Sequence, residues 1–379
     1  MLLALVLTSA LLQGSIPRPS TLRTKVVDAI DHNYLYAEGD SWQSLRAGLL
    51  ADANTTVSAL DQQLSTLHDE DLRIITSKQM AAMQAENAGK ERGIGLVDFA
   101  VTVDQNTGEP KVVTPLVDSP AFKAGLRPRD VIVTVNGRAT HGLIHEDVMA
   151  LLRNDSGTLR LTIRRGRKQI PMDIPLAVWD EQPVVSSRLV VGKQHLGYIG
   201  VRLFTPDSGE QTRKAAESLI DHGVDGCIVD LRNNPGGYLD AMAVAGSAFT
   251  DQTLGWKVRR DDRREPIHSP AKPFKAMQLV VLVNEGTASA AEVLAAGLRD
   301  TTGARLVGAK TYGRGQIQTY VPLDDSSGIV IPAASAESPR GTRFNIGSGL
   351  SPDVVVSSTT DKTGEDVAYR RAINLLTHD

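Results

Sequence analysis

The most informative segment of this chain reads Asn284-Glu285-Gly286-Thr287-Ala288-Ser289-Ala290-Ala291-Glu292. It follows the apolar run at residues 279–283 and precedes an Ala-, Glu- and Leu-rich stretch that reaches Leu298. This order predicts a buried strand, a tight corner and a helix, with Ser289 at the corner. Helix N-terminal N–H groups favour negative charge, so a hydroxyl held there has oxyanion donors beside it. A serine that only caps the helix is the simpler interpretation of the same position.

Two further segments favour a catalytic role for Ser289 over a role in helix capping alone. They read Asp230-Leu231-Arg232-Asn233-Asn234-Pro235-Gly236-Gly237 and Tyr312-Gly313-Arg314-Gly315-Gln316-Ile317-Gln318. In wording and spacing, the three segments together resemble the carboxyl-terminal processing peptidases, or tail-specific proteases, which are S41-type serine peptidases with a Ser-Lys pair. The resemblance implies that Ser289 is the nucleophile, that the N–H groups of Gly237 and Ala290 form the oxyanion hole, and that Gln318 orients the base. A glycine at 237 is expected to leave room for the substrate carbonyl.

Arg314 is the main departure from the family pattern. The family places its lysine 25 residues after the serine, and that position here is Arg314. A partly desolvated lysine can lose its proton and act as a general base, whereas a guanidinium stays protonated in proteins. We therefore expect a serine endopeptidase that works through an acyl-enzyme, with a weak or inactive tail-binding relative as the alternative. Lys310 is the nearest other source of a base along the chain.

A second resemblance concerns the middle of the chain. The segments Gly93-Ile94-Gly95-Leu96, Ser119-Pro120-Ala121-Phe122-Lys123-Ala124-Gly125-Leu126-Arg127-Pro128-Arg129-Asp130 and Val135-Asn136-Gly137 are similar to those of PDZ domains. The resemblance implies that the N–H groups of residues 93–96 bind the terminal carboxylate of a peptide. The peptide itself would add to a free strand edge by β-augmentation.

The apolar spacing divides the chain into regions. It is largely helical between residues 21 and 84, changes to short β-type runs from 93 to 175, and then alternates strands with helices. We expect an α+β multidomain protein with a helical region at 21–90, a PDZ domain at 91–177 and a catalytic core at 178–379. The family resemblance implies that this core is an α/β fold of the ClpP/crotonase-like type.

Composition limits the remaining possibilities. The 379 residues are 41% apolar and 22% charged with a formal net charge of -3, which argues against a nucleic-acid partner. The single cysteine, Cys227, excludes an internal disulfide, and its apolar neighbours predict a buried strand. We expect no metal or cofactor, and substrates that are proteins with unstructured, apolar C-terminal tails.

The first residues bear on localisation. Residues 1–12 are apolar and too short to span a bilayer, and within residues 1–20 they resemble the apolar part of a secretory signal. This predicts export to a periplasm or a thylakoid lumen, with a core helix as the alternative. No other stretch has the length of a membrane span.

Overall fold

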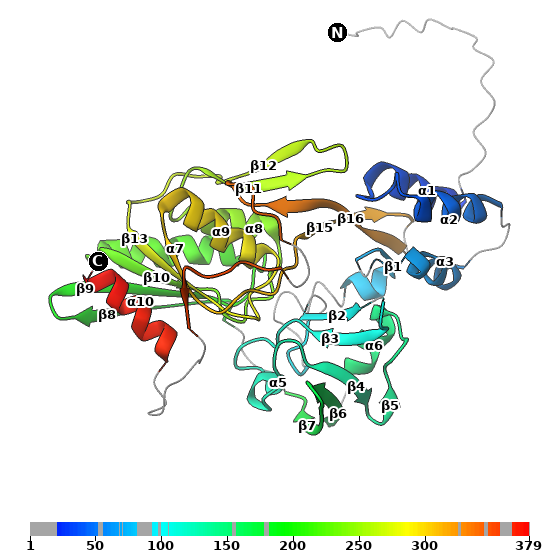
Figure 1. The fold of residues 1–379 in the computed structure, drawn as a ribbon, viewed down its shortest axis with the longest axis horizontal. Helices are drawn as coiled ribbons and strands as arrows, with labels where there is room; N and C mark the ends of the chain where they lie inside the picture. The colour runs from blue at the N-terminus through cyan, green and yellow to red at the C-terminus, as the bar shows by residue number, and fades with distance from the viewer. Residues whose placement is uncertain are drawn as a thin grey trace, which may run out of the picture.

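The computed structural model describes residues 21–51, 56–67, 69, 71–81, 93–97, 100–104, 106–153, 157–177, 182–324, 327–344, 348–356 and 366–378. Three units follow one another along the chain: N-terminal helices, a β-rich domain and a larger α/β core (Figure 1). Residues 1–20, and with them the predicted signal segment, lie outside the described residues. Within the described residues, no helix combines the length and the apolar character needed to cross a membrane.

The N-terminal unit consists of short helices packed on a β-strand. Its elements are α1 (Leu22–Asn33), α2 (Asp40–Ala51), α3 (Val57–Leu64) and the 3-10 turn η1 (Ser65–Leu67). Val26, Ile30 and Trp42 are buried with Ile329 and Ile331 of strand β16 (Ser327–Glu337). The predicted helices are therefore present, and their apolar faces are covered by the core's own strand.

One element of this unit differs from the prediction. Residues 73–76, expected in the helical region, form strand β1 (Arg73–Thr76), which pairs antiparallel with β16. The segment Ile74-Ile75-Thr76 is β-branched and fits a pleated sheet better than a helix. A free edge on β16, which helical spacing does not reveal, completes the pairing.

The middle unit is a small antiparallel sheet with two helices. Its elements are β2 (Val101–Asp104), β3 (Glu109–Val112), β4 (Val131–Val135), β5 (Arg138–Ala139), β6 (Thr158–Arg165), β7 (Lys168–Pro175), α5 (Pro120–Lys123) and α6 (His145–Leu152). The strand order is β2-β3-β4-β6-β7, with β5 beside β4, so β2 is at one edge. Gly93 and Ala177 form a bridge that closes the unit.

The core is built on a mostly parallel sheet. Its strands, in the order β17-β14-β13-β10-β9-β8, are β17 (Val354–Val355), β14 (Arg305–Gly308), β13 (Gln278–Val283), β10 (Gly226–Asp230), β9 (Gln194–Val201) and β8 (Val184–Val191). Only β8 runs antiparallel to its neighbour. This alternation of strands and helices confirms the predicted α/β layer.

Helices cover both faces of the core sheet. Alternate residues of β13 pack into two clusters, one with α9 (Ala290–Thr302) and the other with α10 (Val367–His378). Helices α7 (Ser208–Asp221) and α8 (Leu239–Gly246) contribute to the α9 side. Cys227 is fully buried in β10, as predicted, and burial raises the pKa of its thiol to about 12.

A second sheet connects the core to the N-terminal helices. Strand β16 pairs with β15 (Gln316–Pro322) along its length, with β1 near its start and with β11 (Thr253–Val258) near its end. Strand β12 (Arg264–His268) pairs with β11 at the outer edge. Figure 1 shows the β15–β16 hairpin reaching from the core to helices α1 and α2. Because β15 starts two residues after Arg314, this hairpin sets the position of that residue.

Candidate active site

Ser289 lies at the corner between β13 and α9, as predicted. Its backbone has φ 54° and ψ −124°, and α9 begins at the next residue. Such a conformation is sparsely populated for a residue with a side chain and costs about 1–3 kcal/mol. The corner is tied down by the Thr287 hydroxyl, which donates to the Leu231 carbonyl at 2.8 Å. The structure therefore maintains a strained serine at the start of a helix.

Glu292 fastens this corner to the loop that contains Arg314. The carboxylate accepts from the N–H of Ser289 at 3.0 Å, and from the N–H groups of Gly313 and Arg314, each at 2.8 Å. The Thr311 hydroxyl donates to it as well. Burial raises the pKa of Glu292, and the four hydrogen bonds to its charged form oppose that rise. The Ser-x-x-Glu spacing is that of a capping box, but only the structure shows the second loop that this carboxylate holds.

Gly237 and Ala290 line the same cavity as Ser289, and the partners of their backbone N–H groups bear on its chemistry. Phe204 donates its N–H to the Gly236 carbonyl at 2.9 Å and accepts from the Tyr238 N–H at 2.8 Å. These bonds turn the N–H of the intervening Gly237 to the opposite side of the strand. Among the described residues, neither the Gly237 N–H nor the Ala290 N–H has an acceptor. Both are available to a carbonyl oxygen in the cavity.

Packing against Phe204 is a further reason for glycine at 237. A Cβ atom at Gly237 would lie 2.3 Å from the Phe204 carbonyl oxygen, so packing on that strand excludes a side chain. Gly236, which the sequence reasoning did not single out, lies directly against Ser289 and Ala290. A Cβ there would lie 2.8 Å from the Ser289 Cβ and 3.1 Å from the Ala290 nitrogen.

The predicted catalytic and oxyanion residues meet around one cavity of about 270 Å³. Its lining includes Ser289, Ala290, Gly237, Arg314 and Gln318. Within the described part of the chain, the lining contains two arginines and no lysine, histidine, aspartate or glutamate. Lys310 is exposed and lies outside this lining. The cavity thus contains a serine hydroxyl and two backbone N–H groups without a side chain that is an ordinary proton acceptor.

Arg314 is held by a buried carboxylate from the N-terminal unit. Its Nη2 lies 2.5 Å from Oδ1 of Asp71, and the two side chains are 10% and 1% exposed. The other oxygen, Asp71 Oδ2, is buried without a hydrogen-bond partner among the described residues. A buried guanidinium beside a carboxylate remains charged. No sequence signal pointed to Asp71, because it is 243 residues away from its partner.

The predicted carboxylate-binding loop lies at the edge of the middle unit. Ile94 and Leu96 are buried in the core of that unit, and Gly95 has φ 84°. The Gly93 N–H donates to the Ala177 carbonyl at 3.2 Å. Within the residues that the structure describes, the N–H groups of Ile94, Gly95 and Leu96 have no acceptor. Three of the four predicted donors therefore remain open to a ligand.

Comparison with known proteins places these features in a family. Residues 195–356 match the model of peptidase family S41, and residues 111–165 match a PDZ domain. A carboxyl-terminal-processing protease of Synechocystis is 32% identical, with 86% of this chain and 78% of that protein covered. A chloroplastic C-terminal processing peptidase of Tetradesmus obliquus is 33% identical, with coverages of 86% and 75%.

A solved structure agrees with the sequence relatives. The photosystem II D1 C-terminal processing protease superposes with a TM-score of 0.78 at 31% identity, covering 88% of this chain and 92% of that one. The match extends over the N-terminal helices, the PDZ domain and the α/β core. The chain therefore belongs to peptidase family S41, as a PDZ-containing member of the carboxyl-terminal-processing serine proteases.

Proposed function

We propose that this protease cleaves near the C-terminus of protein substrates by acyl transfer to Ser289. The Ser289 Oγ attacks the scissile carbonyl carbon, and its proton leaves to an acceptor. The C–N bond then breaks, the new amine takes a proton, and water hydrolyses the ester to free the acid and the serine. The developing oxyanion is stabilised by the N–H groups of Gly237 and Ala290.

The observation that carries the proposal is the gathering of Ser289 and two acceptor-free N–H groups in one cavity. The strained backbone of Ser289 and the hydrogen bonds from Gly313 and Arg314 to Glu292 support it, because a serine that only capped a helix would require neither. The open N–H groups of residues 94–96 support capture of a free C-terminal carboxylate by the PDZ domain.

We further propose that turnover is slow, because Arg314 occupies the position of the general base. Loss of a positioned base costs a factor of about 10² to 10⁴. In that case water or hydroxide must take the serine proton. The Arg314–Asp71 ion pair favours a second candidate function. In it, the protein binds substrate tails through its PDZ domain and does not cleave them.

For localisation, we propose export to a periplasm or lumen, which the apolar start of the sequence supports. One of the relatives is named as chloroplastic. Fractionation of cells that express the full chain, followed by N-terminal sequencing of the product, tests this directly.

The function itself is tested by cleavage of an unfolded protein with an apolar tail. The wild type, Ser289→Ala and a substrate with an amidated C-terminus are compared under the same conditions. We expect a slow reaction that Ser289→Ala abolishes and amidation weakens. Cleavage that survives in Ser289→Ala would remove Ser289 as the nucleophile. Tail binding without any cleavage would select the second candidate.

A further inference from the structure

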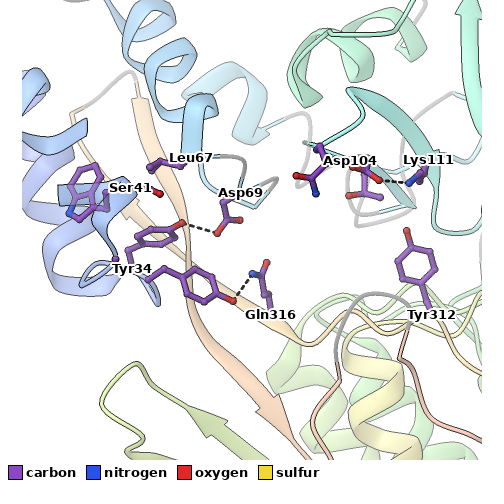
Figure 2. Close-up of a pocket in the computed structure, with 13 residues that line it drawn as sticks. Tyr34, Ser41, Leu67, Asp69, Asp104, Lys111, Tyr312 and Gln316 are labelled. Carbon is purple, nitrogen blue, oxygen red and sulfur yellow. Dashed lines mark hydrogen bonds and ion pairs between the residues drawn. The ribbon is translucent and has the colours of Figure 1, made fainter. Parts of the chain in front are cut away.

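A second and larger cavity adjoins the active site. It has a volume of about 510 Å³, which is within the range of ligand sites. Its walls come from the N-terminal unit, from the β2–β3 end of the PDZ domain and from the loop before β15. Figure 2 shows Tyr34, Asp69 and Gln316 on one side of this space and Asp104, Lys111 and Tyr312 on the other. Gln316 also lines the Ser289 cavity, so the two spaces are neighbours.

One carboxylate in this cavity forms no ion pair with any residue that the structure describes. Asp104 is paired with Lys111, which holds the pKa of Asp104 below its ordinary value. Asp69 accepts only neutral hydrogen bonds, from the Tyr34 hydroxyl and from the Asp71 N–H, each at 3.1 Å. Among the described residues, no lysine, arginine or histidine forms an ion pair with it; Arg314 pairs with Asp71 and acts on Asp69 only through its charge, which partly opposes the rise of the Asp69 pKa.

The pKa of Asp69 agrees with the absence of an ion pair at this carboxylate. Burial, followed by the charge of Asp71, raises the pKa of Asp69 to about 6. A carboxylate that is partly desolvated and unpaired gains most from the arrival of a cation. At neutral pH it is still largely ionised, so the cavity presents a negative charge.

Aromatic rings line the same cavity. Tyr34 and Tyr36 pack edge to face at 5.6 Å, and Tyr36 remains 50% exposed at the cavity mouth. Tyr312 on the far side already receives Arg129 over its ring at 5.4 Å. Ring faces and a carboxylate together favour a cation carried on an apolar stem, as in the side chains of lysine and arginine.

The position of the cavity points to the substrate tail as the molecule that carries this cation. A tail whose carboxylate lies at residues 94–96, and which adds antiparallel to the edge strand β2, runs from Asp104 toward Val101, so its residues upstream of the carboxylate lie near Asp104. Thr102 and Asp104 of this strand line the cavity, and Gln316 leads from it to Ser289. The cavity therefore lies on the path between the captured carboxylate and the scissile bond.

We propose that this cavity is a specificity site that binds a lysine or arginine side chain of the substrate tail, between the PDZ-bound carboxylate and the bond cleaved at Ser289. Asp69 pairs with the cationic head, and Tyr34 and Tyr36 contact the stem. This assignment rests on the proposed function for the direction of the tail. The preferred substrate tail would then have an apolar C-terminus, as expected from the sequence, and one basic residue upstream of it.

The test measures peptide binding to the full chain. Peptides share one apolar C-terminus with a free carboxylate and differ in a single lysine, which is moved position by position along the tail. At one register we expect lysine to bind about tenfold more tightly than norleucine or acetyl-lysine at that position. These comparisons use the wild-type protein, so they do not depend on the folding of a variant.

Two variants assign the effect to the cavity. Asp69→Asn should abolish the preference for lysine over norleucine, whereas Asp40→Asn should keep it. Asp40 is a matched control, because it is an exposed carboxylate beside the lining residues Gly39 and Ser41 without itself lining the cavity. A wild type without a lysine preference, or a preference that survives Asp69→Asn, would overturn the proposal.

The same assay separates this proposal from the proposed function. Binding is measured by calorimetry, so absence of turnover does not affect the result. If amidation of the tail has no effect but the Asp69-dependent preference for lysine remains, PDZ capture fails and the cation site stands. If amidation weakens binding and lysine brings no gain, capture stands and the cation site fails.

Discussion

At the scale of single residues, the site depends on charges that are buried and matched. Glu292 is fully buried with four donors around it, and Arg314 is neutralised by Asp71. A buried carboxylate without such partners costs several kcal/mol, so each of these residues is stable only in this arrangement. The ion pair with Asp71 also favours the protonated, charged form of the side chain at position 314.

The first prediction concerns Glu292. In Glu292→Gln the amide NH₂ must face backbone N–H groups that now donate to the carboxylate, so at least one donor loses its acceptor. We expect the free energy of unfolding to fall by about 3 kcal/mol and acylation of Ser289 to slow. Urea unfolding measures the first effect. Glu217→Gln, at an exposed position of α7, is the control, and an equal loss in both variants would contradict the role given to Glu292.

The second prediction concerns position 314. In Arg314→Lys the buried Asp71 carboxylate would pair with the ammonium and raise its pKa, so the lysine would lose its proton only at high pH. Adding Asp71→Asn removes that stabilisation, and burial then lowers the lysine pKa. We expect the rise of the acylation rate with pH to occur at lower pH in the double variant than in Arg314→Lys. Coincident pH profiles would show that Asp71 does not control the group at 314.

The sequence was informative about most single residues of the site but not about all of them. Ser289, Ala290, Gly237, Arg314 and Gln318 were identified by motif and lie around one cavity. Asp71 and Gly236 were missed for physical reasons. The first acts across 243 residues of sequence, and the second acts through the position of a missing Cβ atom.

At the scale of elements, the loop after β10 is fitted against the start of α9. Gly236 has φ 109°, and its hydrogen faces the Ser289 side chain. Local patterns predicted the core strands and helices well, because their apolar periodicity reflects burial in one sheet. They did not predict β1, since its pairing partner β16 begins more than 200 residues later in the chain.

The third prediction separates backbone strain from contact in this loop. Gly236→Ala and Gly223→Ala both place a side chain at positive φ, but the new Cβ meets Ser289 in the first and nothing within 4 Å in the second. We expect both to lose about 1 kcal/mol of stability, and only Gly236→Ala to lose acylation, by at least about 10². Intact-mass time courses give the acylation rate. Normal acylation in folded Gly236→Ala would place the substrate carbonyl elsewhere.

At the scale of the whole molecule, three units contribute residues to the proposed substrate path. The PDZ domain offers N–H donors at residues 94–96, the N-terminal unit supplies Asp69 and Asp71, and the core supplies Ser289. Strand β16 connects the N-terminal unit to the core through its pairing with β1 and β11. The order of units along the chain was predictable from the spacing of apolar residues and the family resemblance, but the contribution of all three units to one cavity was not.

The fourth prediction tests the start of this path. A peptide with an apolar C-terminus and a free carboxylate should bind at least about tenfold more tightly than its amidated form, because amidation removes a charge-assisted contact to backbone N–H groups. Calorimetry on Ser289→Ala measures binding without cleavage. Equal affinities for the two peptides would exclude carboxylate capture.

The central claim is that Ser289 forms an acyl-enzyme at a site where a permanent cation replaces the base. The most direct measurement is the rate at which a small activated ester acylates the intact protein, followed by mass spectrometry. We predict a single adduct on Ser289 that forms slowly in the wild type, is absent in Ser289→Ala, and forms at least about tenfold faster in Asp71→Asn/Arg314→Lys. Equal rates in the wild type and the double variant, or an adduct that persists in Ser289→Ala, would contradict the claim.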